Sequence, residues 1–535
     1  MKKEFFANYV KNIILPCLIF SLITGILTGF IVVLYKIAAN KVFELSDCVY
    51  AFIKNDYRLI FAAIAAVGAI AFLGKYFYKF IPDARGGGIA AAMGFVRGLL
   101  TFKWLRTLIG TLFASLVTFF IGTPLGNEGP SVLAGATVGR GVVKIFGKNN
   151  PAWDRYMMTG GACAGFAVAT NAPLTGVLFA VEEAHNRLSP MIIMVAGATV
   201  CFSLITSRII SPFVNIDPNL FANLSPIVLA PKHLWIAALI GIVCGFESVL
   251  FNKIFQLINK FVNVKLKKVN KWLTMFVIFT ISVICCTYLA GFGGTGHHLV
   301  EQILHKPALP FLILLLYFVL RAILTAGGAA AGITGGTFIP ILTLGALASA
   351  MLANILEFLG LITQDYYQVI ILMGMASCFA GMTKTPITAI TFAMEALALT
   401  SNVLGVAVCV FLTYIITEIF CPHSINDTVL ETRVENQNEG KVALLIDTII
   451  TVKQNSFVVG KSIRDILWPN NLFVLSIKKN NGNTRVDQRG ETTISAGDKL
   501  HVRFSSYNVE STHDELQALV GNQTFEDSEW VEDYK

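Results

Sequence analysis

The sequence is poor in charged residues, and its cysteines and histidines show no pattern typical of a metal site. Only 14% of its 535 residues are charged, against roughly 25% in soluble proteins. The ten cysteines are scattered, several of them inside apolar runs, so neither a structural zinc nor a disulfide framework is expected. The histidines of "GHHLVE" lack the His-Glu-x-x-His spacing of a zinc protease. These absences argue against a soluble protein and against a resident metal or other cofactor.

Hydrophobic residues are correspondingly abundant. Hydrophobic residues make up 55% of the chain, and the mean hydropathy is +0.67. A membrane-spanning helix needs about 20 apolar residues, and several runs reach or approach that length: Ile13–Leu34, Leu108–Leu125, Met191–Ile210, Leu234–Phe251, Trp272–Gly291 and Val403–Phe420. Shorter runs, such as Leu59–Leu73, Phe311–Leu320 and Val369–Phe379, predict helices of unequal length. The expected fold is an all-α, multi-pass membrane protein.

The net charge of +8 does not indicate a nucleic-acid partner, because many lysines and arginines gather beside apolar segments, as in Lys2, Lys3 and Lys11 and in Lys265–Lys271. By the positive-inside rule such segments face the cytoplasm. The first apolar run is not followed by a small-residue cleavage site, so we interpret it as a retained span. We therefore expect a protein of the cell membrane whose amino and carboxy termini are both cytoplasmic.

The chain contains an internal repeat. The segment Gly161–Ala184 aligns with Gly374–Leu397 at a constant offset and without a gap. A proline (Pro173 and Pro386) and a glutamate (Glu182 and Glu395) fall in register, which membrane composition alone does not readily explain.

Glycine-rich segments precede both copies. "GNEGP", Gly126–Pro130, lies in the first half and "GTFIP", Gly336–Pro340, in the second; "RGGGIA" and "GGTGHH" lie further upstream. Interrupted apolar segments at corresponding positions of two halves indicate a transporter whose site lies near the bilayer midplane. Irregular backbone survives there only if it lines a cavity or is buried, and the free N–H groups of helix starts favour an anion. The competing interpretation is that the glycines only permit close helix packing.

Glu128 is a carboxylate between two glycines at what we expect to be membrane depth. A charged residue there costs about 2.5–3.5 kcal/mol on insertion scales and is usually functional. The alternative is a simple cap of the following helix.

Three motifs carry a resemblance to a known family: "GNEGPSVLAGATVGR", "PLTGVLFAVEEA" and "GGTFIP", each in its expected half. They resemble the CLC family of chloride channels and proton-coupled anion antiporters over roughly Leu15 to Thr432. The resemblance implies a transmembrane domain of residues 1–432 with two inverted halves, about 12–210 and 233–420, built from tilted and partly discontinuous helices. It also implies a homodimer in the lipid bilayer with one anion pathway per subunit.

The same resemblance assigns roles to individual residues. Glu128 matches the gating glutamate, which competes with the anion and accepts a proton from outside, and Glu183 matches the inner proton-transfer glutamate of the antiporters. Its repeat twin is Ala396, so only the first half could carry the proton step. Glu182 has a twin, Glu395, which favours a structural role such as capping or pairing. The positions matching the anion path are Gly126, Asn127, Gly129, Gly87, Gly88, Thr337, Phe338, Ile339 and Asn426.

Some positions depart from the family pattern. Asn127 stands where the family often has a basic residue, Gly87 where a serine contacts the inner anion, and Asn426 where a tyrosine hydroxyl closes the inner gate. The physiological anion is therefore not fixed by the sequence, and the loss of the inner hydroxyls could loosen coupling.

A small soluble domain follows the last span, over residues 433–522. "LLIDTIITV", "FVVG", "LFVLSI" and "DKLHVRF" are predicted strands of an α+β unit that resembles the RCK/TrkA carboxy-terminal type. An unidentified regulatory ligand and a plain dimer-stabilising role both stay open for it. Residues 523–535 are acidic and expected to be disordered.

The leading functional hypothesis is exchange of protons for chloride or another small anion. The alternative is a passive chloride channel gated by voltage or pH, which the positions of Gly87 and Asn426 favour. A membrane enzyme would need a nucleophile and base or a metal constellation at depth, and the sequence offers neither.

Overall fold

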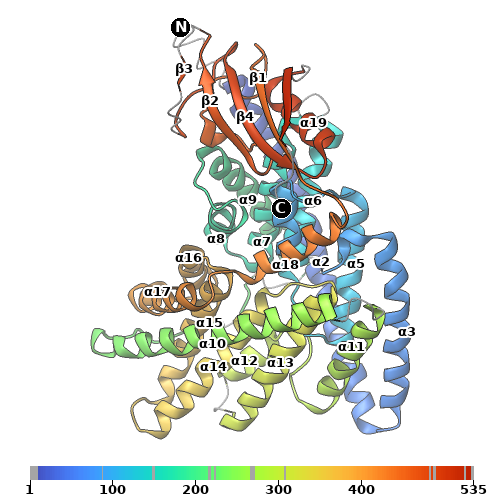
Figure 1. Cartoon of the computed structure of the whole chain (residues 1–535). Helices are drawn as coiled ribbons and strands as arrows, with labels where there is room; N and C mark the ends of the chain where they lie inside the picture. The colour runs from blue at the N-terminus through green and yellow to red at the C-terminus, as the bar shows by residue number, and fades with distance from the viewer. Residues whose placement is uncertain are drawn as a thin grey trace.

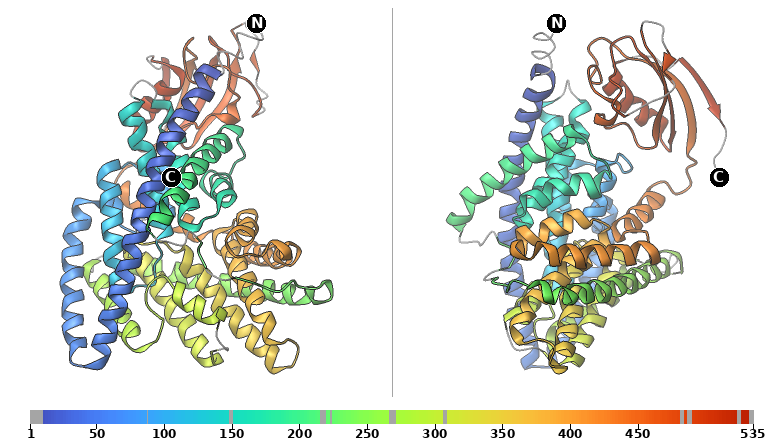
Figure 2. Two further views of the ribbon diagram at one scale, coloured as in Figure 1. Left: turned by 180° about the vertical axis from the view of Figure 1, so that it is seen from behind. Right: turned by 90° about the vertical axis from the view of Figure 1, so that its left-hand side faces the viewer.

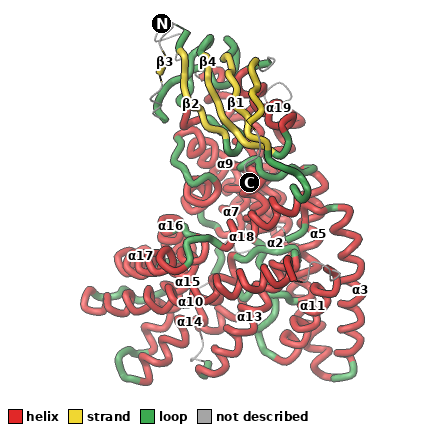
Figure 3. The backbone as a smooth tube through the Cα atoms, viewed as in Figure 1, coloured by secondary structure: helices red, strands yellow, loops and turns green. Residues whose placement is uncertain are grey.

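The computed structural model describes residues 10–86, 88–147, 151–214, 219–221, 224–265, 271–305, 309–480, 484–485, 490–522 and 526–531. A helical body forms most of the molecule, and a small β-sheet domain lies at one end of it (Figure 1). The colouring by secondary structure in Figure 3 shows the same division, with the strands confined to that end.

The first half of the helical body begins with a helix of 41 residues and contains another of only six. Its helices are α2 (Leu15–Asn55), α3 (Leu59–Phe80), α4 (Ile89–Val96), α5 (Trp104–Ile121), α6 (Glu128–Phe146), α7 (Asp154–Thr170), α8 (Pro173–Leu178) and α9 (Pro190–Ile210). A π-helical turn, Phe179–Ala184, continues α8. The predicted inequality of helix lengths is confirmed.

The second half repeats this order of long, short and interrupted helices. Its helices are α10 (Leu234–Lys260), α11 (Lys271–Tyr288), α12 (His297–His305), α13 (Phe311–Ala331), α14 (Phe338–Phe358), α15 (Tyr367–Thr383), α16 (Pro386–Ala396) and α17 (Val403–Phe420). The repeat seen in the sequence has a matching backbone: α7 and α15 each end at a residue with positive φ, Asn171 and Lys384. A proline then begins α8 and α16, a position where its missing N–H and fixed φ cost nothing.

The long helices pack against their own half in the same way. α2 packs on α9 as α10 packs on α17, and glycines allow the close approach. A Cβ on Gly25 would lie 2.7 Å from the carbonyl oxygen of Thr199, and one on Gly241 would lie 2.7 Å from that of Cys409. These glycines therefore serve helix packing. In Figure 2, α2 runs from the level of the sheet to the far end of the body.

Ten of the described helical segments are long and apolar enough to cross a membrane by length and composition. They include α3 and α13, which extend beyond the short apolar runs of the sequence, and α14, which no predicted span covered. The multi-pass membrane protein predicted from composition is thus confirmed.

The last body helix, α18 (Ile425–Gln437), leads to the carboxy-terminal domain. Its strands are β1 (Leu444–Thr451), β2 (Leu472–Lys478), β3 (Thr484–Arg485), β4 (Lys499–Ser506) and β5 (Glu526–Val531). They form an antiparallel sheet in the order β3-β2-β4-β1-β5. Alternate residues of β4, Leu500, Val502 and Phe504, are buried in a core that also contains Leu516 and Leu519 of α19 (Val509–Val520). The predicted small α+β domain is confirmed.

Two expectations for this domain differ from the structure. "FVVG" forms turns and not a strand, because Phe457 packs on Trp153 and Tyr156 of the helical body. In the acidic end, expected to be disordered, Glu526–Val531 forms β5 on the free edge of β1; residues 523–525 and 532–535 lie outside the described residues. An unpaired strand edge is a template for a further strand, so backbone pairing prevails over acidic composition.

Candidate functional site

The beginnings of α4, α6 and α14 meet at one place in the helical body. Gly126 and Gly336 form an antiparallel bridge, in which each amide donates to the other's carbonyl at 2.6 and 2.7 Å. A Cβ on Gly129 would lie 2.7 Å from Cα of Gly336 and 3.0 Å from Cα of Gly88. Only glycine permits this approach of three backbones, so these glycines are where the two halves join.

This junction gathers main-chain hydrogen-bond donors. The first four N–H groups of a helix have no acceptor within it, and the helix dipole adds partial positive charge at the same end. Phe338 and Ile339, in the first turn of α14, are buried, and Thr337 precedes them as the N-cap residue. Such a set of donors can bind an anion without any cationic side chain. Of the sequence-predicted residues, Gly87 lies outside the described residues.

Glu128 is the first residue of α6 and lies at this junction. Its side chain is buried, with 1% exposure, and its Oε2 atom has no hydrogen-bond partner among the described residues. The side chain of Asn127, at the N-cap position, makes no capping bond. A buried carboxylate oxygen without a partner is costly, and a helix cap gives no physical reason for that cost.

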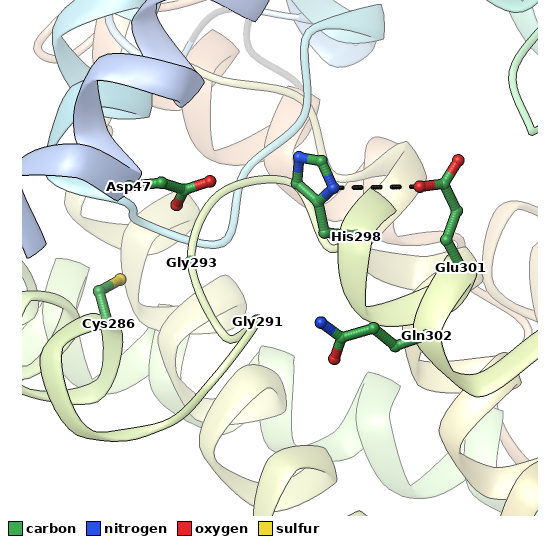
Figure 4. Close-up of a pocket in the computed structure, with 7 residues that line it drawn as sticks. All are labelled: Asp47, Cys286, Gly291, Gly293, His298, Glu301 and Gln302. Carbon is green, nitrogen blue, oxygen red and sulfur yellow. Dashed lines mark ion pairs between the residues drawn. The ribbon is translucent and has the colours of Figure 1, made fainter. Parts of the chain in front are cut away.

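A cavity of about 370 Å³ reaches Glu128. Asn127 and Ile339 also line it, as do residues of α2 and α12. A second cavity of about 430 Å³ shares Asp47, His298 and Glu301 with the first. In Figure 4, His298 and Glu301 lie side by side, and Asp47 projects from the opposite wall. Nε2 of His297 lies 3.3 Å from Oε1 of Glu301. Four carboxylates and one lysine are among the described residues that line the first cavity, so this mouth, which leads to Glu128, is mainly acidic.

Glu183 lies in a different environment, in the π-helical turn after α8. Its side chain is buried, and Nδ2 of Asn426 donates to Oε1 at 2.5 Å. Arg97 donates to the main-chain carbonyls of Glu183 and Ala184 at 2.8 and 2.7 Å and forms an ion pair with Asp427 at 3.3 Å. Asn426 is thus hydrogen-bonded to Glu183, and its predicted role as an anion ligand stays a prediction. No sequence motif gave a signal for Arg97.

The carboxy-terminal domain binds the chain directly after Glu183. Arg187 donates to the carbonyl of Ile466 at 3.0 Å, and Ser189 Oγ lies 3.2 Å from Oδ1 of Asp465. The hydroxyl of Tyr156, on α7, donates to the carbonyl of Asp465 at 2.6 Å. The carboxy-terminal domain is therefore attached to the helical body beside Glu183.

Glu182 and Glu395 cap each other's helices across the two halves. The carboxylate of Glu182 accepts from the amides of Ile387 and Thr388 at 3.0 and 2.7 Å, at the start of α16. Glu395 accepts from the amides of Leu174 and Thr175 at 2.8 and 2.9 Å, at the start of α8. The structural role predicted for this pair is confirmed, and it is a reciprocal cap.

No group of three or more His, Cys, Asp or Glu side chains in the described part of the chain is placed to hold a metal ion.

Comparison with protein families gives two matches. Residues 68–418 match the family model described as voltage gated chloride channel, and residues 448–517 match the TrkA-C domain. Among curated proteins, the H(+)/Cl(-) exchange transporter ClcA of Vibrio parahaemolyticus is 28% identical over 383 residues, which cover 71% of this chain and 81% of the relative. The transporter of the same name from Vibrio cholerae is 29% identical over 391 residues, or 71% of this chain and 81% of the relative.

Solved structures share the architecture. The chain matches a slow cyanobacterial Cl-/H+ antiporter with a TM-score of 0.72 and 23% identity, covering 79% of this chain and 99% of the other. It matches a CLC-type fluoride/proton antiporter with a TM-score of 0.63 and 18% identity, covering 78% of this chain and 98% of the other.

Proposed function

Because the chain belongs to the voltage gated chloride channel family, a family of transporters and not of enzymes, we propose that it exchanges chloride or another small anion for protons across the cell membrane. The observation that carries the proposal is the carboxylate of Glu128, which is buried at the junction of the helix starts and has one oxygen without a partner in the described part of the chain. The relatives named above as H(+)/Cl(-) exchange transporters support the same reaction.

Glu128 acts as the exchanging group in this proposal. As an anion, its carboxylate occupies the donor-rich junction and keeps the permeating anion out. When it accepts a proton from the cavity, its negative charge is lost and an anion takes its place among the main-chain donors. Anion and proton movement are thereby linked, because the same donors serve either the carboxylate or the anion.

Glu183 carries the proton on the other side. It is buried beside Asn426 and close to the contact with the carboxy-terminal domain, which we propose to be cytoplasmic. Its repeat twin is Ala396, so one half of the molecule supplies both proton-handling carboxylates. Arg97 holds the main chain of Glu183 and thereby keeps this side chain oriented.

A passive anion channel is the second candidate. Neither Gly87 nor Asn426 offers a hydroxyl, so an anion would meet fewer side-chain ligands on the cytoplasmic side. An inner barrier weakened in this way would let anions pass without a proton. Currents that reverse at the anion Nernst potential and do not respond to a pH gradient would establish this candidate.

Parallel recording of proton and chloride flux in liposomes tests the proposal. We expect a chloride gradient to drive uphill proton movement in the unmodified protein. Glu128→Gln should abolish proton movement while chloride flux persists, and Glu183→Gln should do the same. Glu431→Gln, an exposed change on α18, is the matched control and should leave both fluxes unchanged. Chloride flux without proton movement in the unmodified protein would refute exchange.

The remaining expectations belong to the same proposal. We propose a homodimer with one anion pathway per subunit and cytoplasmic termini. A reporter fused after Lys535 should be reached only from the cytoplasmic side, and cross-linking in the membrane should give a species of twice the subunit mass.

A further inference from the structure

The cavity that leads to Glu128 is lined by a surplus of acidic side chains. Glu44, Asp47 and Glu301 line it together with Glu128. Asn127, which also lines the cavity, contributes no charge. Negative charges around a narrow, partly desolvated mouth repel an anion. An anion that uses this mouth therefore needs a compensating positive charge in its wall.

Lys36 supplies a positive charge in this wall. It lies on α2, far in sequence from "GNEGP", and among the described residues that line the cavity it is the only lysine or arginine. It is partly buried, and it lines the same cavity as Glu128.

A second cation lies behind the wall and does not line the cavity. Arg321 is fully buried on α13, and its guanidinium donates to the carbonyls of Phe292 and Gly294 at 2.7 and 3.1 Å. Its charge is used to hold the loop that precedes α12. Lys36 is therefore the cation that an entering anion meets.

We propose that Lys36 is a positioning residue for anion entry, which attracts the anion into the acidic mouth and guides it to the place that Glu128 vacates. This inference rests on the proposed function. Lys36 acts through its charge, so its effect falls as salt screens it; the Debye length is about 8 Å at 0.15 M ionic strength.

A purely structural role is the competing explanation. The Nζ of Lys36 donates to the carbonyl of Ala169 at 3.3 Å, in the last turn of α7, and a cation there stabilises a helix end. Glutamine at position 36 retains a hydrogen-bond donor but not the charge, whereas arginine retains both. If the charge of Lys36 acts on anion entry, only Lys36→Gln should change KM. If the role is structural, both variants should lose kcat and thermal stability equally.

The test compares chloride dependence of transport by the full chain in liposomes, at about 20 mM and about 500 mM ionic strength set with an impermeant salt. Lys36→Gln should raise KM for chloride about three- to tenfold at low ionic strength with kcat nearly unchanged, and the difference should vanish at high ionic strength. Lys36→Arg should keep the original KM. Lys41→Gln, the same charge change at an exposed position of α2, is the control and should have no effect.

A second variant tests the same electrostatic effect by removing a negative charge from the cavity lining. Glu44 is exposed and lines the cavity, so Glu44→Gln should fold normally and lower KM about twofold. An unchanged KM in Lys36→Gln or Glu44→Gln would overturn the inference, as would equal losses of kcat and thermal stability in Lys36→Gln and Lys36→Arg. If the unmodified protein moves chloride without protons, the exchange proposal fails, while the KM comparison still decides the role of Lys36.

Discussion

Replacing Gly129 by alanine should disable transport, because the new methyl group would meet backbone on two sides. Its Cβ would lie 2.7 Å from Cα of Gly336 and 3.0 Å from Cα of Gly88. The closer distance is at least about 0.7 Å shorter than ordinary van der Waals contact. Neither neighbour is a flexible side chain, so the starts of α4, α6 and α14 have to move apart.

The cost can be estimated from the bridge that joins the halves. Moving Gly129 away from Gly336 stretches the two hydrogen bonds between Gly126 and Gly336, which measure 2.6 and 2.7 Å. Leaving a buried donor or acceptor unpaired costs about 1–3 kcal/mol per group, and overpacking alone costs about 1–3 kcal/mol. We expect a destabilisation of about 2–5 kcal/mol. A misplacement of about 1 Å can lower the rate of a positioned reaction ~100-fold, and chloride flux should fall at least tenfold.

Gly197→Ala is the matched control. Gly197 lies within α9, and a Cβ there would meet no atom within 4 Å. Alanine gains about 1 kcal/mol of helix propensity in a helix interior such as that of Gly197, so a loss confined to Gly129→Ala reports the clash. Chloride efflux from liposomes and thermal unfolding in detergent should be measured for both variants. Efflux by Gly129→Ala equal to that of Gly197→Ala would refute the role of the junction.

Two further predictions concern a helix cap and a buried lysine. Glu395→Gln weakens the hydrogen bonds to the amides of Leu174 and Thr175. It should lower the free energy of unfolding by about 1–2 kcal/mol, which is measured as a lower melting temperature. Glu431→Gln, exposed on α18, is the control and should leave the melting temperature unchanged. In the carboxy-terminal domain, burial lowers the pKa of Lys461 to about 7. Between about pH 7 and 10.5 the unfolded chain therefore binds more protons than the folded chain. The free energy of unfolding should rise with pH in this range by up to about 1.4 kcal/mol per pH unit. Lys461→Met should flatten the dependence of the urea midpoint on pH between 7 and 9, whereas Lys478→Met, exposed on β2, should leave it unchanged.

Much of the helical body could be predicted because its signals are local. Apolar runs mark the spans, and the repeat places a proline at the start of both α8 and α16. A glutamate follows in each copy, Glu182 in the π-helical turn that continues α8 and Glu395 near the end of α16. The twin glutamates predicted a structural role for Glu182, and the structure adds which amides they bind. α14 was not among the predicted spans, although the glycine-rich segment before it was predicted to adjoin a helix start.

The parts that could not be predicted depend on contacts between distant segments. Lys36 lies in the middle of a long apolar helix, and no motif connects it with Glu128. Strand β5 consists of acidic sequence that no strand pattern favours, and it forms because β1 offers an unpaired edge. "FVVG" has strand composition, but Phe457 packs against the helical body instead. Tertiary contacts override local preference in each case.

The reciprocal caps also determine when, during synthesis of the chain, the first half can complete its structure. The acceptor of the α8 amides, Glu395, lies 221 residues after Leu174. At a synthesis rate of about 5–20 residues per second, that interval lasts on the order of 10–40 s. During that time the amides at the start of α8 lack their acceptor, because Glu395 has not yet been synthesised. The first half can reach its final form only after nearly the whole second half has emerged, and a messenger truncated between the two would yield a polypeptide with its short helix permanently uncapped.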